Sequence, residues 1–161
     1  MPLTDEELAE LTRRVGYAVL QIQELEETLQ VHLVRVYKAD EKAAWREVEA
    51  MFEKTSKQTL GRLFYAIRDK GKCPPNLLSR LEHCVEERNW LVHRSRRENP
   101  KNVRSDAKRS EVIVRITAVV NEALSLMTTF QELTEAHLIE RGADRATIQA
   151  RAAEIRREWD Q

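Results

Sequence analysis

The fold class of this chain is determined by residues 4–37, TDEELAELTRRVGYAVLQIQELEETLQVHLVRVY. Apolar or small residues recur there at alternating intervals of three and four, at Leu8, Leu11, Val15, Ala18, Ile22, Leu25 and Leu29, and His32 and Val36 continue the spacing. This heptad pattern is typical of a helix that buries one face, and it predicts a helix over about residues 5–37. Thr4 and Glu7 have the spacing of a capping box, which would start that helix.

Similar patterns predict the remaining helices. The second helix is expected over about residues 40–71, with Asp40 as its N-cap and a loosened or bent stretch at 55–59. The third is expected over 76–96 and the fourth from Ser105 or Asp106 to Arg141. A short last helix should follow its cap, Asp144. Gly71 and Gly142 are the expected C-caps, and the Pro74-Pro75 pair is a firm break.

No stretch shows the strict alternation of a strand, and the chain has only four glycines and four prolines. The predicted fold is therefore all-α, an antiparallel four-helix bundle with long first and fourth helices and a short C-terminal extra helix. We expect residues 1–141 to form the bundle. Residues 142–161 would be an extension that packs on the same domain or on a partner.

Composition describes a soluble globular protein of 161 residues with 42% hydrophobic residues, 34% charged residues and no net charge. The charge is unevenly distributed: residues 1–30 have seven acidic and two basic side chains (net −5), whereas residues 88–115 have nine basic and three acidic ones (net +6). Such asymmetry suggests a local anion-binding face. Short apolar runs, no signal-peptide pattern and only two cysteines predict a cytoplasmic protein without a membrane span or a disulfide framework.

The predicted third helix has an unusual residue on its buried side. Its apolar stripe consists of Leu77, Leu81, Val85 and Val92, flanked by Leu78, Cys84 and Leu91. Arg88 falls close to the centre of that stripe, where a charge is costly unless something pairs with it or uses it. Asn89 and His93 are four residues apart and share one edge of the same face. Trp90 lies on the opposite side, where the sequence does not decide between packing and exposure.

These three polar residues suit chemistry on a phosphodiester. A guanidinium offers a planar fork for phosphate oxygens, an imidazole can move a proton near neutral pH, and an amide can orient either group. Arg94, Arg96, Arg97, Lys101 and Arg104 are the candidate RNA-binding residues beside them. The alternative is that Arg88 pairs with a carboxylate, His93 is a surface imidazole and the basic run is a solvated surface. The basic run has no interleaved aromatic residues, so base stacking is not indicated there.

The segment Arg88-Asn89-Trp90-Leu91-Val92-His93 resembles the R-x4-6-H signature of HEPN domains, with a polar residue directly after the arginine. Residues 59–63, TLGRL, are also similar to a segment that precedes the motif in some bacterial members. The resemblance covers roughly residues 4–141. It implies a bundle of four or five helices with the motif near the end of the third core helix.

Many HEPN domains are metal-independent endoribonucleases that act as homodimers, with the two motifs meeting at the interface. By this resemblance Arg88 would bind the scissile phosphate and Asn89 would position a reacting group. His93 would assist attack by the RNA 2′-hydroxyl or protonate the leaving oxygen. The resemblance also implies a toxin or phage-defence component, with an antitoxin or a larger defence protein as partner and no cofactor.

Two other functions remain open at this stage: a catalytically inactive helical interaction module, and a bundle that binds a nucleotide or another phosphorylated ligand through Arg88. A metal site is not expected. His83 and His93 are ten residues apart, about 280° round a helix from one another, so one helix cannot offer both to one metal. Sequence motifs of P-loop NTPases, α/β-hydrolases and zinc proteases are absent.

Overall fold

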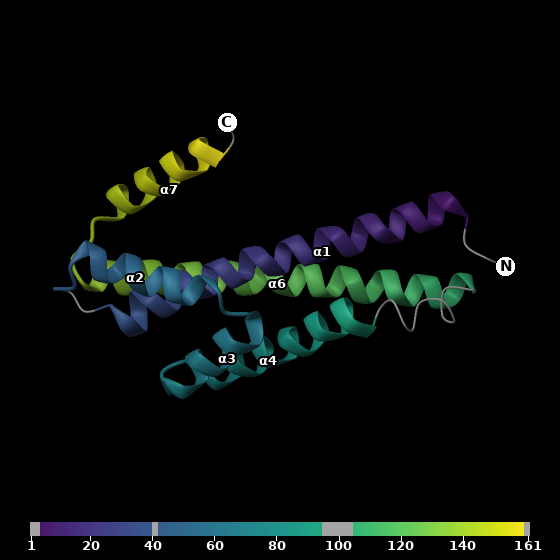
Figure 1. Ribbon diagram of the computed structural model, residues 1–161, viewed down its shortest axis with the longest axis horizontal. Coiled ribbons are helices and arrows are strands. Elements are labelled where there is room, and N and C mark those ends of the chain that lie inside the picture. Colours follow the sequence, from purple (N-terminus) through teal and green to yellow (C-terminus); the bar gives the residue numbers. More distant parts are fainter. Residues whose placement is uncertain (1–3, 40–41, 95–104, 160–161) are drawn as a thin grey trace.

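The computed structural model describes residues 4–39, 42–94 and 105–159, and within these ranges every regular element is helical (Figure 1). The elements in chain order are α1 (Asp5–His32), the π-helical segment η1 (Leu33–Lys38), α2 (Trp45–Ser56), α3 (Leu60–Asp69), α4 (Pro75–Asn89), a second π-helical segment η2 (Trp90–Arg94), α6 (Asp106–Glu140) and α7 (Arg145–Trp159). The predicted all-α class is confirmed.

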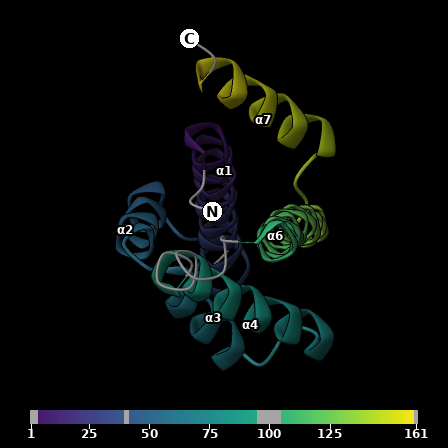
Figure 2. The same cartoon turned by 90° about the vertical axis from the view of Figure 1, so that its right-hand side faces the viewer.

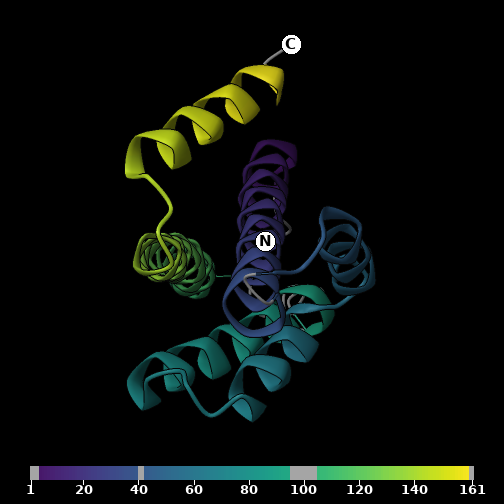
Figure 3. The ribbon, with the colours of Figure 1, turned by 90° about the vertical axis from the view of Figure 1, so that its left-hand side faces the viewer.

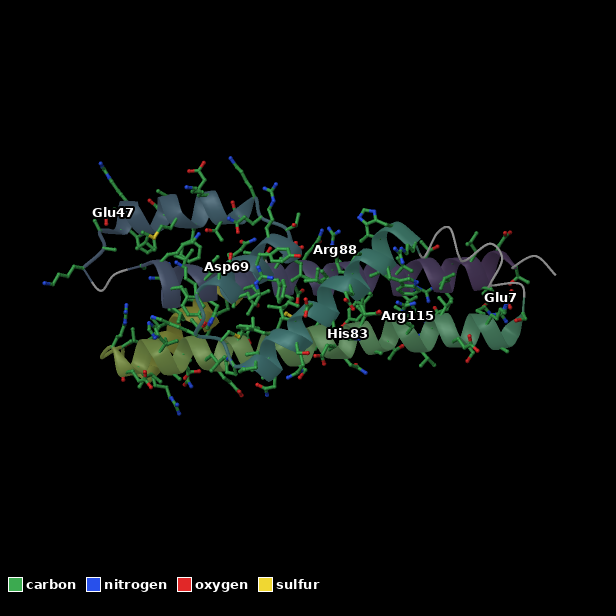
Figure 4. The ribbon with its side chains drawn as sticks, turned by 90° about the horizontal axis from the view of Figure 1, so that it is seen from below. Glu7, Glu47, Asp69, His83, Arg88 and Arg115 are labelled. Carbon is green, nitrogen blue, oxygen red and sulfur yellow. The ribbon has the colours of Figure 1, made fainter. Side chains whose placement is uncertain are left out.

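The long helices α1 and α6 lie side by side and run in the same direction (Figure 1). Glu7 at the start of α1 pairs with Arg109 at the start of α6 at 2.9 Å, and His32 at the end of α1 lies 2.9 Å from Thr134 near the end of α6. This parallel pair differs from the predicted antiparallel arrangement. The segment that was expected to form one bent helix forms two helices, α2 and α3, and the chain reverses direction between them (Figures 1 and 4). Because of this additional reversal, α6 runs in the same direction as α1.

The predicted stripe of α1 forms most of its contact with the core. Leu11, Ala18, Ile22, Leu25, Leu29 and His32 are buried, and they meet a buried row on α6 that includes Ala123, Leu126 and Phe130. Leu8, near the start of α1, is the exception, with 52% of it exposed. Burial of this seam is the main contribution to the stability of the pair.

Helices α3 and α4 form a second layer on one side of the α1–α6 pair (Figures 2 and 3). Leu60, Leu63, Ile67 and Leu81 are fully buried in this layer. A side chain of α1 also caps α3, because Glu26 Oε1 accepts a hydrogen bond from the Leu60 backbone N–H at 2.8 Å. This bond satisfies one of the unpaired N–H groups at a helix start and ties the two layers together.

The predicted caps agree with the structure except at α2. Thr4 and Glu7 form both bonds of the capping box, Ser105 Oγ accepts from the Lys108 N–H, and Asp144 accepts from the Thr147 N–H. Gly71 and Gly142 end their helices with φ of 65° and 90°, a conformation that glycine adopts without strain.

Helix α2 begins at Trp45 and not at the predicted Asp40, which lies outside the described residues. The Glu47 carboxylate accepts the Ala44 backbone N–H at 3.3 Å, which fixes the later start. The predicted third helix, residues 76–96, corresponds to α4 and η2, which end at Arg94 in the described part of the chain.

Helix α6 and helix α7 bear on the surroundings of the fold, a membrane or a partner. Helix α6 (from Ala107 to Glu140) is long and apolar enough to cross a membrane by length and composition alone, but it is also the core helix that packs on α1. The cytoplasmic location therefore stays a prediction. Helix α7 lies on the side of the α1–α6 pair opposite α3 and α4 (Figures 2 and 3). It contacts α6 near its own start, where Arg145 pairs with Glu135 at 3.2 Å.

Candidate functional site

The candidate site lies where α4 changes from an α-helix to the π-helical segment η2. On a regular α-helix Arg88 and His93 would be about 140° apart. A π turn closes its hydrogen bonds between residues five apart, so it brings residues with this spacing nearer to one side of the helix, and such turns occur frequently at functional sites. The π turn therefore makes the angle between the two residues about the helix axis smaller than it would be on a regular helix.

The apolar stripe of this segment was predicted only in part. Leu77, Leu81, Cys84 and Leu91 are buried, but Val92, expected on the buried stripe, is 44% exposed. Trp90, which the sequence left open, is buried at 7% exposure. The covered side changes along the segment because α4 packs on α3 and α6, whereas η2 also contacts α1.

Arg88 is half-buried, and its Nη1 donates a hydrogen bond to Asn89 Oδ1 at 3.4 Å. In Figure 4 it projects from α4 on the side away from α6, whereas His83 and Arg115 lie on the α6 side. No carboxylate among residues 4–39, 42–94 and 105–159 lies within ion-pair distance of Arg88, since Glu87 pairs with Arg115 and Glu86 lies beside His83. The alternative of a simple Arg88–carboxylate pair therefore gains no support from the described residues.

An open cleft of about 770 Å³ adjoins the end of α4. It is lined by Glu86, Glu87, Asn89, Trp90, His93, Arg94 and Arg115. Three predicted site residues, Asn89, His93 and Arg94, thus meet in one cleft and are exposed to solvent. Arg88 is not part of this lining but lies directly beside it through its bond to Asn89. The other predicted RNA-binding residues, Arg96, Arg97, Lys101 and Arg104, lie outside the described residues.

Sequence reasoning missed an ordered group on the α6 side of the cleft. Arg115 donates from Nε and Nη2 to the two carboxylate oxygens of Glu87, both at 2.7 Å, and its guanidinium lies 3.8 Å from the centroid of the Trp90 ring. The Arg115 hydrogen bonds hold the pKa of Glu87 below its usual range, so the pair stays ionised at neutral pH. The sequence placed Arg115 only within a basic region, because no local pattern links it to a tryptophan 25 positions earlier.

The Cys84 thiol of α4 is buried and does not line the cleft. Burial raises the pKa of the Cys84 thiol to about 12, which makes it a poor nucleophile at neutral pH. Within the described ranges no three histidine, cysteine, aspartate or glutamate side chains gather in a way that suits a metal ion. The lining of the cleft offers imidazole, amide, guanidinium and carboxylate groups.

Comparisons of this chain with protein-family models, curated proteins and solved structures found no match. The geometry of the cleft is accordingly the basis for assigning a function.

Proposed function

We propose that this chain is a metal-independent endoribonuclease of the HEPN type, which cleaves RNA at the cleft beside the end of α4. One observation carries the proposal: Asn89 and His93 line the same open cleft, and the half-buried Arg88 beside them has no carboxylate partner in the described part of the chain. A partly desolvated guanidinium without a counter-ion favours binding of an anion. A phosphodiester would supply that anion.

The reaction would use the RNA's own 2′-hydroxyl as nucleophile. Its oxygen attacks the adjacent phosphorus, the bond from phosphorus to the 5′-oxygen breaks, and the products are a 2′,3′-cyclic phosphate and a 5′-hydroxyl. Arg88 would stabilise the negative charge that develops on the non-bridging oxygens. His93 would accept the proton of the 2′-hydroxyl or give one to the leaving 5′-oxygen, and Asn89 would orient one of these groups.

A second copy of the chain is part of this proposal. The reaction needs a base for the 2′-hydroxyl and an acid for the leaving oxygen, whereas each cleft contains one histidine, His93. Two clefts that face each other in a homodimer would provide both. In a cell, an RNase of this kind would suit a toxin or a phage-defence component that an antitoxin or a larger defence protein restrains.

The test is cleavage of labelled RNA by the purified protein in excess chelator. We expect wild-type protein to cut and both Arg88→Ala and His93→Ala to lower the rate by about 100-fold or more. His83→Ala is the matched control, because it removes an exposed imidazole on α4 that does not line the cleft. RNA that stays equally intact with wild type and with all three variants, over several substrates, would refute the nuclease.

A second candidate function is a catalytically inactive helical interaction module. The observation that favours it is a set of large apolar side chains exposed on the two long helices: Leu20 at 56%, Val31 at 42%, Val114 at 66% and Leu124 at 40%. Leu20 and Val31 are eleven residues apart and therefore point in about the same direction from α1, and exposed apolar side chains that lie together mark interaction sites. Under this alternative, Leu20→Glu and Leu124→Glu would abolish self-association in light scattering, and His93→Ala would change nothing.

A further inference from the structure

A groove of about 400 Å³ lies between the two long helices, beside the start of α7. Thr28 and Val31 of α1 and Gln131 and Leu138 of α6 are among the residues that line it. Helix α7 lies on the side of the α1–α6 pair opposite α3 and α4 (Figures 2 and 3). The groove is therefore separate from the candidate cleft, which adjoins the end of α4.

Exposed apolar side chains continue the groove along both long helices. Leu20 precedes Val31 by eleven residues and Leu124 precedes Gln131 by seven, so each points in about the same direction from its helix as the groove residue that follows it. Leu20 is 56% exposed, Val31 42% and Leu124 40%. The strip from Leu20 to Val31 is about 16 Å long, or three helical turns. The groove and these exposed side chains together form what we call the outer face.

The outer face is acidic. Residues 15–32 of α1 and 116–140 of α6 contain no lysine or arginine, but they contain seven glutamates: Glu24, Glu26, Glu27, Glu122, Glu132, Glu135 and Glu140. Glu24 is exposed and precedes Val31 by seven residues, so it lies on the outer face, and Glu135 lines the groove. Carboxylates among exposed apolar side chains would repel the same face of a second copy and favour a partner that is both cationic and apolar.

The start of α7 shows which side chains the outer face accepts. Arg145 pairs with Glu135 at 3.2 Å, and Ile148 lines the groove. Arg145 and Ile148 are three residues apart, so a cation and an apolar side chain from neighbouring positions of one helix contact one end of the outer face. The rest of α7 leads away from the helix pair, and Leu20 and Leu124 stay exposed (Figure 1).

We propose that the outer face binds a basic amphipathic helix of a partner protein. Apolar side chains of that helix, at spacings of three and four, would pack on Leu20, Val31 and Leu124. Lysine or arginine side chains beside them would pair with Glu24 and its neighbouring carboxylates, as Arg145 does with Glu135. A helix of about three turns covers the exposed strip. The proposal does not depend on RNA cleavage, because the outer face and the cleft are separate surfaces.

The experiment measures the binding of two fluorescein-labelled helical peptides to the full-length protein by fluorescence anisotropy. Both peptides have about 15 residues and the same leucine positions, at alternating spacings of three and four. The positions beside the leucines are lysine in one peptide and glutamate in the other. We expect the lysine peptide to bind at least about tenfold more tightly than the glutamate peptide, and its affinity to fall as the salt concentration rises.

Glu24→Lys should weaken binding of the lysine peptide by about tenfold, because it replaces an attraction at the outer face with a repulsion. Glu82→Lys is the matched control, since it makes the same change in net charge at an exposed glutamate of α4, on the other side of the α1–α6 pair. Leu20→Ala should also weaken binding by about tenfold, because it removes an apolar contact. Glu24 and Leu20 are both exposed, so neither change removes a core contact.

Four results would overturn the partner helix. The first is equal affinity of the Glu24→Lys and Glu82→Lys forms for the lysine peptide, and the second is equal affinity of wild-type protein for the two peptides, or no binding of either. Binding that occurs only in full-length protein with Ile148→Asp would mean that α7 itself covers the outer face. A wild-type dimer in light scattering that becomes a monomer with Leu20→Ala would mean that a second copy covers it.

Discussion

His32 and Thr134 join the ends of the two long helices across 102 positions of sequence, with 2.9 Å between Nδ1 and Oγ1. The Thr134 hydroxyl donates its one hydrogen to the Phe130 carbonyl at 2.8 Å, so the imidazole must donate through Nδ1. The rings of Phe130 and Tyr37 contact the imidazole edge to face, with centroids 5.0 and 5.2 Å away. His32, which continues the predicted stripe of α1, is thus a core residue that holds the parallel pair in register.

This histidine should make the protein less stable in mild acid. Burial, and then the nearby His137, lower the pKa of His32 from 6.5 to about 4. Between these values the unfolded chain binds more protons than the folded one. The His32 contribution is therefore nearly complete above pH 6.5, decreases progressively as pH falls below 6.5, and is fully lost once pH has fallen through about 4. The loss between pH 7 and pH 5 should be about 2 kcal/mol, visible as a lower thermal midpoint by circular dichroism.

The His32→Gln variant is the control for this effect, because glutamine keeps a hydrogen-bond donor and does not titrate. We expect it to be less stable than wild type at pH 7 and to keep almost the same midpoint down to pH 5. A wild-type midpoint that does not change between pH 7 and pH 5 would contradict the assignment of a neutral buried imidazole.

The Glu26 carboxylate should stabilise the start of α3. It accepts the Leu60 N–H at 2.8 Å, whereas the side chain of Thr59, the N-cap residue, makes no capping bond. Glu26→Ala should lower the free energy of unfolding by about 1 kcal/mol in urea denaturation, the usual cost of a lost cap. Glu27→Ala removes an exposed carboxylate from the next position and should change it by less than about 0.5 kcal/mol.

The same contact explains why the sequence predicts some helices well and others less well. Helices α1 and α6 have long apolar stripes and strong local caps, so their bounds follow from spacing alone. The break between α2 and α3 has neither glycine nor proline within residues 55–60, and the bond that starts α3 comes from Glu26 on another helix. Local sequence patterns therefore do not predict the break between α2 and α3, and the direction of α6 depends on that break.

The candidate site divides in the same way. Asn89 and His93 are near in sequence, and their spacing predicted that they would share a face. Arg115 reaches the cleft from α6, and its place above Trp90 depends on how α4 packs across α6. The sequence pattern did not predict the π-helical segment η2. In that segment Trp90 is buried and Val92 is exposed, the reverse of what a regular helix predicts for Val92.

Arg94 should contribute a non-specific electrostatic contact with RNA. It is exposed and lines the cleft next to His93. Arg94→Ala should weaken binding of all RNA sequences alike and reduce the slope of log affinity against log salt by about one. Arg145→Ala, which removes a 69% exposed arginine from α7, should leave the slope unchanged. The same slope in both variants would place the RNA away from the cleft.

Helix α7 should be dispensable for the fold and for the cleft. It lies on the side of the α1–α6 pair opposite α3 and α4 (Figures 2 and 3). Its described attachments are the exposed Arg145–Glu135 pair and the groove that Ile148 lines with Val31 and Leu138. An exposed ion pair contributes at most about 1 kcal/mol, so a chain ending at residue 143 should unfold in urea with a free energy within about 2 kcal/mol of the full chain. Its RNA affinity should be unchanged.

A chain ending at residue 136 is the contrast, because it also loses Leu138 and the bond from Arg141 to the Ala39 carbonyl. Equal instability of both truncated chains would mean that α7 is part of the bundle core.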